Sequence, residues 1–211
     1  MKIVATSDTH FPFDDRLIPD GDVFLHGGDL MSSGYEREWY SRVESLKNLP
    51  HKTKIYVPGN HDFHVQNYTG PANQDLRAAG VHLLGTHSHY FTHELENGMV
   101  VLGLPFVTGL ESWAFNRSED DLERLVDCLP DADIVLSHSP PSGILDKTNG
   151  GYHVGVLAWY KYLMTRSPKI WICGHIHESY GHRNVRGTDF YNVAMCNRQY
   201  EQANPAVVIE V

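Results

Sequence analysis

The chain has 211 residues, a formal net charge of −9 and 41% hydrophobic residues. This length predicts a single domain over residues 1–211, large enough to fold without disulfides. The acidic balance argues against a broad basic surface for duplex nucleic acid or anionic lipid. No apolar run approaches the roughly 20 residues of a membrane helix. With three widely spaced cysteines and no signal-peptide-like start, we expect a cytoplasmic protein.

Short apolar runs and segments with helical spacing alternate along most of the chain. A short apolar run is typical of a buried strand, whereas apolar residues at i, i+3 and i+4 indicate a helix. In chain order we expect strands at 3–5 and 23–25, a helix at 35–49, a strand at 55–57, a short helix at 73–79, strands at 81–84 and 99–104, a helix at 118–129, a strand at 134–136, a helix at 153–165, and strands at 170–173, 190–194 and 206–211. The alternation favours an α/β fold.

Two local features refine these elements. The region 81–104 has strand signals without a helix, which indicates that part of the sheet is antiparallel. Ser118 precedes the helix at 118–129 and Asp121 follows three positions later, as in a capping box. Trp39 and Trp159 lie in helical patterns, where we expect them to pack in the core.

Residues with metal-binding or catalytic side chains directly follow five of the apolar runs. In open α/β sheets, ligands bind beyond the carboxyl ends of the strands, so we expect these side chains to share one rim. In chain order they are Asp8-x-His10, Gly28-Asp29, Gly59-Asn60-His61-Asp62, His138 and Gly174-His175-x-His177. Each motif alone is common, but chance assembly of all five is improbable. A single structural zinc would need only four ligands and would leave the others unexplained.

This ordered set of motifs resembles the calcineurin-like metallophosphoesterase superfamily and spans the chain from Asp8 to His177. Three further segments, 113–116, 139–146 and 174–181, look like its metallophosphoesterase-domain (MPPED-type) subgroup. The resemblance implies a four-layer α/β/β/α sandwich, in which two mixed sheets are flanked by helices. It also implies an enzyme, a metal-dependent phosphoric ester hydrolase.

The resemblance further implies two divalent metal ions. Carried over motif by motif, the family pattern assigns one ion to Asp8, His10 and His177, the other to Asn60, His138 and His175, and the bridging position to Asp29. Imidazole and carboxylate ligands suit Mn, Fe, Zn, Co or Ni better than Mg alone, and manganese is our first expectation. Two divalent ions and two ionised aspartates leave a net charge of about +2, which would let an acidic protein bind a phosphate ester.

His61 and Asp62 are the catalytic candidates that the resemblance supplies. Metal binding can lower the pKa of water from 15.7 toward about 7, so a hydroxide held by the metals is the expected nucleophile. His61 has the family's position for a catalytic imidazole and is expected to protonate the leaving oxygen or stabilise the phosphoryl charge. Asp62 is expected to orient His61 or a neighbouring group.

The subgroup resemblance implies a phosphodiesterase acting on small phosphodiesters, such as cyclic nucleotides or related nucleotides. A phosphomonoesterase or nuclease on the same site, and a non-catalytic metal-binding scaffold, stay open as alternatives. A protein Ser/Thr phosphatase is disfavoured, because no Asp-Arg-Gly run follows Gly28-Asp29. We expect a small phosphodiester or nucleotide as partner, and neither long duplex nucleic acid nor a membrane. The helix at 35–49 is open to two roles, core packing or a homodimer face.

The segment around Trp113 also has two interpretations. It can be a loop packed by its own aromatic residues, or a lid in which Trp113 stacks on a base or aromatic leaving group. The second interpretation places Asn116 and Arg117 near the phosphate. Its position between strand and helix signals is typical of loops that carry function.

Overall fold

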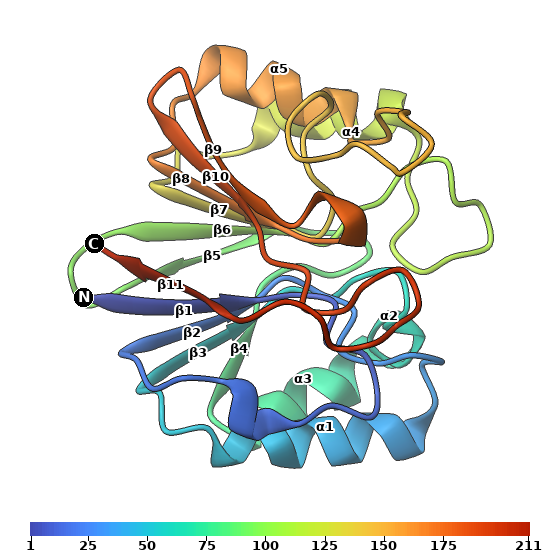
Figure 1. Cartoon of the computed structure of the whole chain (residues 1–211), viewed down its shortest axis with the longest axis vertical. Coiled ribbons are helices and arrows are strands. Elements are labelled where there is room, and N and C mark those ends of the chain that lie inside the picture. Colours follow the sequence, from blue (N-terminus) through green and yellow to red (C-terminus); the bar gives the residue numbers. More distant parts are fainter.

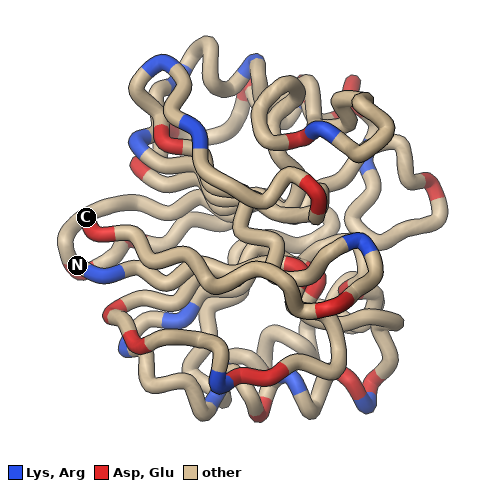
Figure 2. Tube along the Cα trace, in the orientation of Figure 1, with Lys and Arg blue, Asp and Glu red and all other residues tan.

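The computed structural model describes residues 1–211. Two mixed β-sheets lie face to face, and helices cover the outer face of each (Figure 1). This arrangement is the predicted α/β/β/α sandwich, so the fold prediction is confirmed. Acidic and basic residues are interspersed along the chain (Figure 2). None of the helices combines the length and apolar character that crossing a bilayer would need.

The first sheet has the strand order β11-β1-β2-β3-β4. The strands β1 (Lys2–Thr6), β2 (Val23–His26), β3 (Thr53–Tyr56) and β4 (Val81–Leu83) are parallel, and β11 (Val207–Glu210) pairs antiparallel with β1. The helices on this side are α1 (Glu36–Asn48), the short α2 (Phe63–Asn67) and α3 (Thr69–Ala78), with a 3-10 turn at Asp15–Leu17. Crossover connections between the parallel strands thus place α1 and α3 on the outer face (Figure 1).

The second sheet has the strand order β5-β6-β7-β8-β10-β9. Its strands are β5 (Phe91–Glu94), β6 (Val100–Leu104), β7 (Ile134–Ser137), β8 (Ile170–Cys173), β9 (Gly181–Val185) and β10 (Thr188–Asn192). The two edge strands, β5 and β9, are antiparallel to their neighbours. The pairing of β5 with β6 agrees with the antiparallel part expected for the region 81–104, whereas β4 in the same region pairs parallel with β3. The helices α4 (Glu119–Cys128) and α5 (Leu157–Thr165) cover its outer face (Figure 1).

The main core lies between the two sheets. Successive side chains of a strand point to opposite faces, so Ile3 and Ala5 of β1 face the second sheet whereas Val4 packs with the helix layer. All three of these side chains are fully buried. A strand that is buried on both faces has a continuous apolar run in its sequence, which explains why the central strands were predictable. Trp39 and Trp159 are also fully buried, which confirms their predicted core positions.

The sequence-based expectations missed two strands and one helix. Both missed strands, β5 and β9, are edge strands that have mostly partly or fully exposed polar residues and therefore no apolar run. The helix expected at 73–79 begins earlier, at Thr69, and the short α2 precedes it.

The helix expected at 153–165 begins only at Leu157. The residues before it follow an extended path, because Val156 bridges Pro141 and donates its N–H to the Pro140 carbonyl at 2.9 Å. The start of α4 agrees with the prediction. Its N-cap Ser118 accepts the Asp121 N–H at 3.2 Å, and its hydroxyl donates to the Asp121 carboxylate at 2.7 Å.

The parallel strands of both sheets end at the side of the sandwich opposite the chain termini (Figure 1). At this rim the two sheets are joined directly. Ser7, just after β1, pairs with Ala194, just after β10, and donates its N–H to the Val193 carbonyl at 3.0 Å. The loops that follow the strands of both sheets therefore meet in one place.

Candidate metal centre

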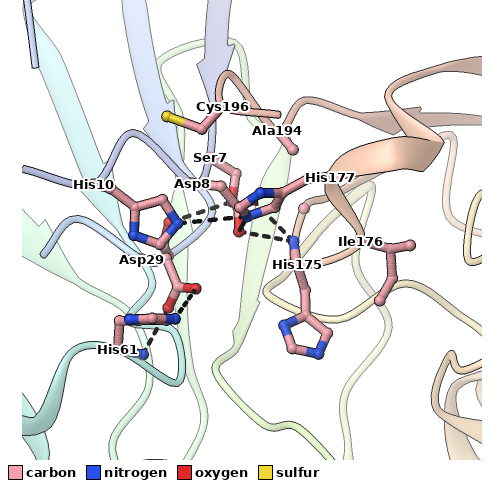
Figure 3. A network of polar contacts seen from close by, with 12 residues as sticks. Ser7, Asp8, His10, Asp29, His61, His175, Ile176, His177, Ala194 and Cys196 are labelled. Carbon is pink, nitrogen blue, oxygen red and sulfur yellow. Dashed lines mark hydrogen bonds and ion pairs between the residues drawn. The ribbon is translucent and has the colours of Figure 1, made fainter. Parts of the chain in front are cut away.

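Loops from both sheets bring the predicted ligands together at this rim, and Figure 3 shows five of them, Asp8, His10, Asp29, His175 and His177. The side chains form three groups, and within each group all the ligand atoms lie within 4.8 Å of one another. The groups are Asp8, His10 and His177; His10, Asp29 and His61; and Asp29, His138 and His175. Because the groups share His10 and Asp29, they form one continuous cluster of donors.

Asn60 joins this cluster through His138. The Oδ1 atom of Asn60 accepts a hydrogen bond from His138 Nε2 at 2.9 Å. Asp29 lies in the middle, with Oδ1 3.5 Å from His138 Nε2 and Oδ2 4.0 Å from His61 Nε2. The structure thus gathers all seven predicted metal positions and His61.

The backbone of the ligand loops is strained. Asp8, His10, Asp29 and His175 have φ angles of 51°, 50°, 55° and 65°, in the left-handed region that residues other than glycine seldom adopt. Such conformations cost of order 1–3 kcal/mol each and cluster at functional sites. Four of the seven predicted ligands therefore have a conformation that the surrounding fold must enforce.

Two glycines make room for the central carboxylates. A Cβ atom on Gly59 would collide with the carboxylate of Asp29, and one on Gly174 would collide with that of Asp8. Neither glycine has a positive φ angle, so close approach rather than backbone freedom requires glycine here. This crowding holds the two aspartates against the loops that carry the other ligands.

Main-chain carbonyls orient three of the four histidines among the predicted ligands. Their Nδ1 atoms donate to main-chain carbonyls: His10 to Met31 at 3.0 Å, His138 to Gly27 at 2.9 Å and His177 to Asn197 at 2.8 Å. With Nδ1 occupied in this way, Nε2 faces the cluster and is the atom available to a metal. Metal-ligating histidines are held in the same manner, so the donor set fits divalent cations.

The electrostatics of the cluster favour a bound cation. Burial alone raises the pKa of Asp8 and Asp29, but hydrogen bonds and charge from His177 and His138 outweigh it and leave both pKa values below the usual range. Burial likewise lowers the pKa of His138 and His177, and their aspartate partners reverse this and raise each to about 9. Without metal, these imidazoles hold protons in the positions that a cation would take.

His175 behaves differently from the other imidazoles. Burial, followed by the positive charge of His138, lowers its pKa to about 3. Its ring is therefore neutral at physiological pH, as a metal ligand must be. Its N–H on the main chain donates to Asp8 Oδ2 at 2.9 Å, which ties the second ligand group to the first.

Asp62 lies beneath the cluster and does not line it. It is fully buried, and its carboxylate accepts main-chain N–H groups from Gly59 at 2.7 Å, Asp29 at 2.9 Å and Met31 at 3.0 Å. Of the two roles expected, orienting a neighbouring group fits this geometry, since Asp62 fixes the loop that carries Asp29. His61 is oriented by Ser32 instead, whose carbonyl accepts from His61 Nδ1 at 2.5 Å.

Two residues of the segment 113–117 reach the cluster, Trp113 with its ring and Ala114 with its N–H, which donates to the Asn60 carbonyl at 3.2 Å. The ring centroid of Trp113 is 4.5 Å from that of His61, and 39% of the Trp113 surface is exposed. Asn116 accepts the Leu110 N–H at 3.0 Å within the loop, and Arg117 donates to the His87 carbonyl. The lid interpretation therefore fits Trp113, while Asn116 and Arg117 are engaged in local structure.

Sequence reasoning missed one residue of the site, Tyr200. Its ring centroid lies 4.7 Å from that of His10. The segment around it has no motif, and only the way the chain returns to the end of β1 brings it to the cluster. No local signal could have found it.

The chain matches the calcineurin-like phosphoesterase family over residues 1–179. It belongs to this family. The chain is 31% identical to UPF0046 protein K07C11.7 of Caenorhabditis elegans, over 98% of this chain and 74% of that protein. It is 29% identical to human metallophosphoesterase domain-containing protein 1, over 100% of this chain and 71% of that protein. The resemblance inferred from the motifs is thereby confirmed.

A solved structure supports the fold independently. The phosphopantetheinyl hydrolase of Mycobacterium tuberculosis superimposes with a TM-score of 0.62 at 15% identity, covering 94% of this chain and 90% of that one. Family membership makes the protein a metallophosphoesterase, a phosphoric ester hydrolase that uses divalent metals, and the cluster supplies candidate ligands for them.

Proposed function

We propose that this protein is a dinuclear-metal-dependent phosphodiesterase that hydrolyses small phosphodiesters, such as cyclic nucleotides or related nucleotides. The observation that carries the proposal is the position of Asp29. It belongs both to a ligand group with His10 and to a group with His138 and His175. One carboxylate placed between two sets of imidazoles fits a pair of ions better than a single ion.

The proposed ligand sets follow the first and third of the three ligand groups, with Asn60 added through its contact with His138. Asp8, His10 and His177 would hold one ion, Asn60, His138 and His175 the other, and Asp29 both. When bound, such a pair supplies a low-pKa water as nucleophile and neutralises charge on the phosphoryl group. Manganese is our first choice among the divalent metals that suit imidazole and carboxylate ligands.

His61 is the proposed proton donor. Ser32 holds its Nδ1 atom, so that Nε2 points toward the cluster, 4.0 Å from Asp29 Oδ2. The side chain is 10% exposed, which leaves access from the mouth of the site. From this position the imidazole can donate to the leaving oxygen or to the developing phosphoryl charge.

The charges around the cluster support a diester rather than a monoester. Asp8 and Asp29 form their ion pairs only with histidines, and no lysine or arginine hydrogen-bonds to a proposed ligand side chain. A phosphate monoester carries up to two negative charges at neutral pH, whereas a diester carries one. Without a fixed cation, the site has less to offer the second charge of a monoester.

Hydrolysis of two simple esters tests the proposal. Metal-free protein would be reloaded with Mn, Zn or Mg and given bis(p-nitrophenyl) phosphate or p-nitrophenyl phosphate. We expect metal-dependent cleavage that favours the diester and falls roughly 100-fold in His61→Ala with its metals retained. His89→Ala, which removes an exposed histidine of a surface loop, is the matched control and should behave as wild type. Preference for the monoester would indicate a phosphomonoesterase, and no turnover with metals bound would indicate a scaffold.

A further inference from the structure

A loop near the C-terminus covers one side of the metal centre. It spans residues 196–204 and is tied to the end of β1, because Cys196 donates its N–H to the Asp8 carbonyl at 3.2 Å. Figure 3 shows Cys196 near Ser7 and Asp8. The loop is closed on itself by the Asn197 N–H, which donates to the Glu201 carbonyl at 2.8 Å. Hydrogen bonds therefore hold this loop in a defined conformation next to the metal centre.

Asn197 sets the conformation of Tyr200 within this loop. The Asn197 side chain accepts N–H groups from Gln199 at 2.9 Å and Glu201 at 3.1 Å, and its carbonyl accepts the Tyr200 N–H at 2.9 Å. Tyr200 is held at a φ of 60°, in the strained left-handed region. The residue is 52% exposed, so this conformation is not maintained in order to bury the ring in the core.

The ring of Tyr200 lies over the proposed ligands and the proposed proton donor. Its centroid is 4.7 Å from His10, 5.6 Å from His177 and 5.8 Å from His61. Trp113, from a separate loop, contacts His61 as well, at 4.5 Å. Two half-exposed aromatic rings thus border the same imidazole at the mouth of the site.

We propose that Tyr200, together with Trp113, selects phosphodiesters that carry a planar aromatic group. The inference rests on the proposed function, in which the cluster binds the phosphoryl group. Both rings are uncharged and exposed, so they can receive a flat ring without desolvating a charge. Stacking of a flat ring on an aromatic side chain strengthens binding by roughly 5- to 150-fold.

A purely structural role for Tyr200 makes a different prediction. The Asn197 carbonyl accepts both the Tyr200 N–H and His177 Nδ1, so the loop also supports a proposed metal ligand. If support were the only role, loss of the Tyr200 ring would weaken every ligand by the same factor. A role in selection would weaken planar ligands alone.

The test compares two monoanions of nearly equal size, ethyl phenylphosphonate and ethyl cyclohexylphosphonate, which differ in the planarity of one ring. Their binding to the Mn-loaded protein would be measured by calorimetry. We expect the wild type to prefer the phenyl compound about tenfold. Tyr200→Leu and Trp113→Leu should each lose most of this preference, whereas Tyr200→Phe should keep it. Tyr160→Leu removes a tyrosine of similar exposure on α5 and is the matched control.

Equal weakening of both phosphonates in Tyr200→Leu, or an unchanged preference, would overturn the inference. Hydrolysis of bis(p-nitrophenyl) phosphate by the same wild-type preparation separates it from the proposed function. Hydrolysis of the diester without a preference for the phenyl phosphonate would overturn the proposed role of Tyr200 and Trp113 but not the proposed function. Absence of both turnover and phosphonate binding would overturn the two together.

Discussion

At the scale of single residues, the three aspartates of the site differ in what they contact. Asp8 and Asp29 face imidazoles, whereas Asp62 accepts main-chain N–H groups from two separate loops. Burial, followed by the charge of Asp29, raises the pKa of Asp62 to about 6, so its hydrogen bonds must offset an unfavourable environment. Asp62 is therefore a positioning residue that acts through Asp29.

Replacing Asp62 tests this role. In Asp62→Ala, the N–H groups of Gly59, Asp29 and Met31 lose their acceptor inside the protein, and each such loss costs about 1–3 kcal/mol. We expect the free energy of unfolding of the metal-free protein to fall by roughly 3–5 kcal/mol in denaturant titrations, with weaker binding of Mn. The exposed Asp20→Ala is the control. Equal stability of the two variants would refute the role.

At the scale of elements, one carboxylate joins the starts of three strands in the second sheet. Asp133 precedes β7 and accepts the Val100 N–H of β6 at 3.0 Å and Lys169 Nζ, next to β8, at 2.9 Å. Its main-chain carbonyl accepts the Ile170 N–H at 3.1 Å. The ends of these strands opposite the metal centre are thus aligned by a single residue, through its carboxylate and its main-chain carbonyl.

The pH dependence of stability tests this joint. The hydrogen bond from Val100, followed by that from Lys169, holds the pKa of Asp133 below its ordinary value. The resulting stability is present above the ordinary carboxyl pKa of about 4 and is lost as pH falls through the lowered value. Asp133→Asn should therefore be less stable than wild type by about 1 kcal/mol at pH 7, allowing for partial exposure. Metal-free melting curves should show this difference shrinking between about pH 5 and pH 3; a constant difference would contradict the account.

At the scale of the whole molecule, the proposed ligands come from both sheets. Asp8 and Asp29 follow strands of the first sheet, and His138 and His175 follow strands of the second. Bound ions would therefore connect the two halves of the sandwich. This placement explains how a cluster of buried charges can be tolerated at the junction between the sheets.

Metal should consequently stabilise the entire fold. A ligand present at 100 times its dissociation constant adds about 2.7 kcal/mol to the free energy of unfolding. We expect Mn to raise the melting temperature of the wild type by several degrees, and His175→Gly to lose much of this increase. Differential scanning calorimetry with and without Mn would measure it. An equal increase in His175→Gly would show that the stabilising ion binds elsewhere.

The central strands and the proposed metal ligands are both predictable from the sequence, and for the same physical reason. The run 170–173 coincides with β8 because central parallel strands are buried on both faces, and ligands that directly follow such strands must meet at one rim. β9 at the sheet edge has no such run. Tyr200 depends on a long-range contact between the loop 196–204 and the end of β1, which no local pattern encodes.

The number of ions bound per chain tests the central claim most directly. Wild type and Asp29→Asn would be loaded with Mn, freed of excess metal and analysed by mass spectrometry. Since Asp29 belongs to both ligand groups, we predict two ions in the wild type and the loss of both in Asp29→Asn. A single ion in the wild type, or one ion retained at full occupancy in Asp29→Asn, would contradict a shared dinuclear centre.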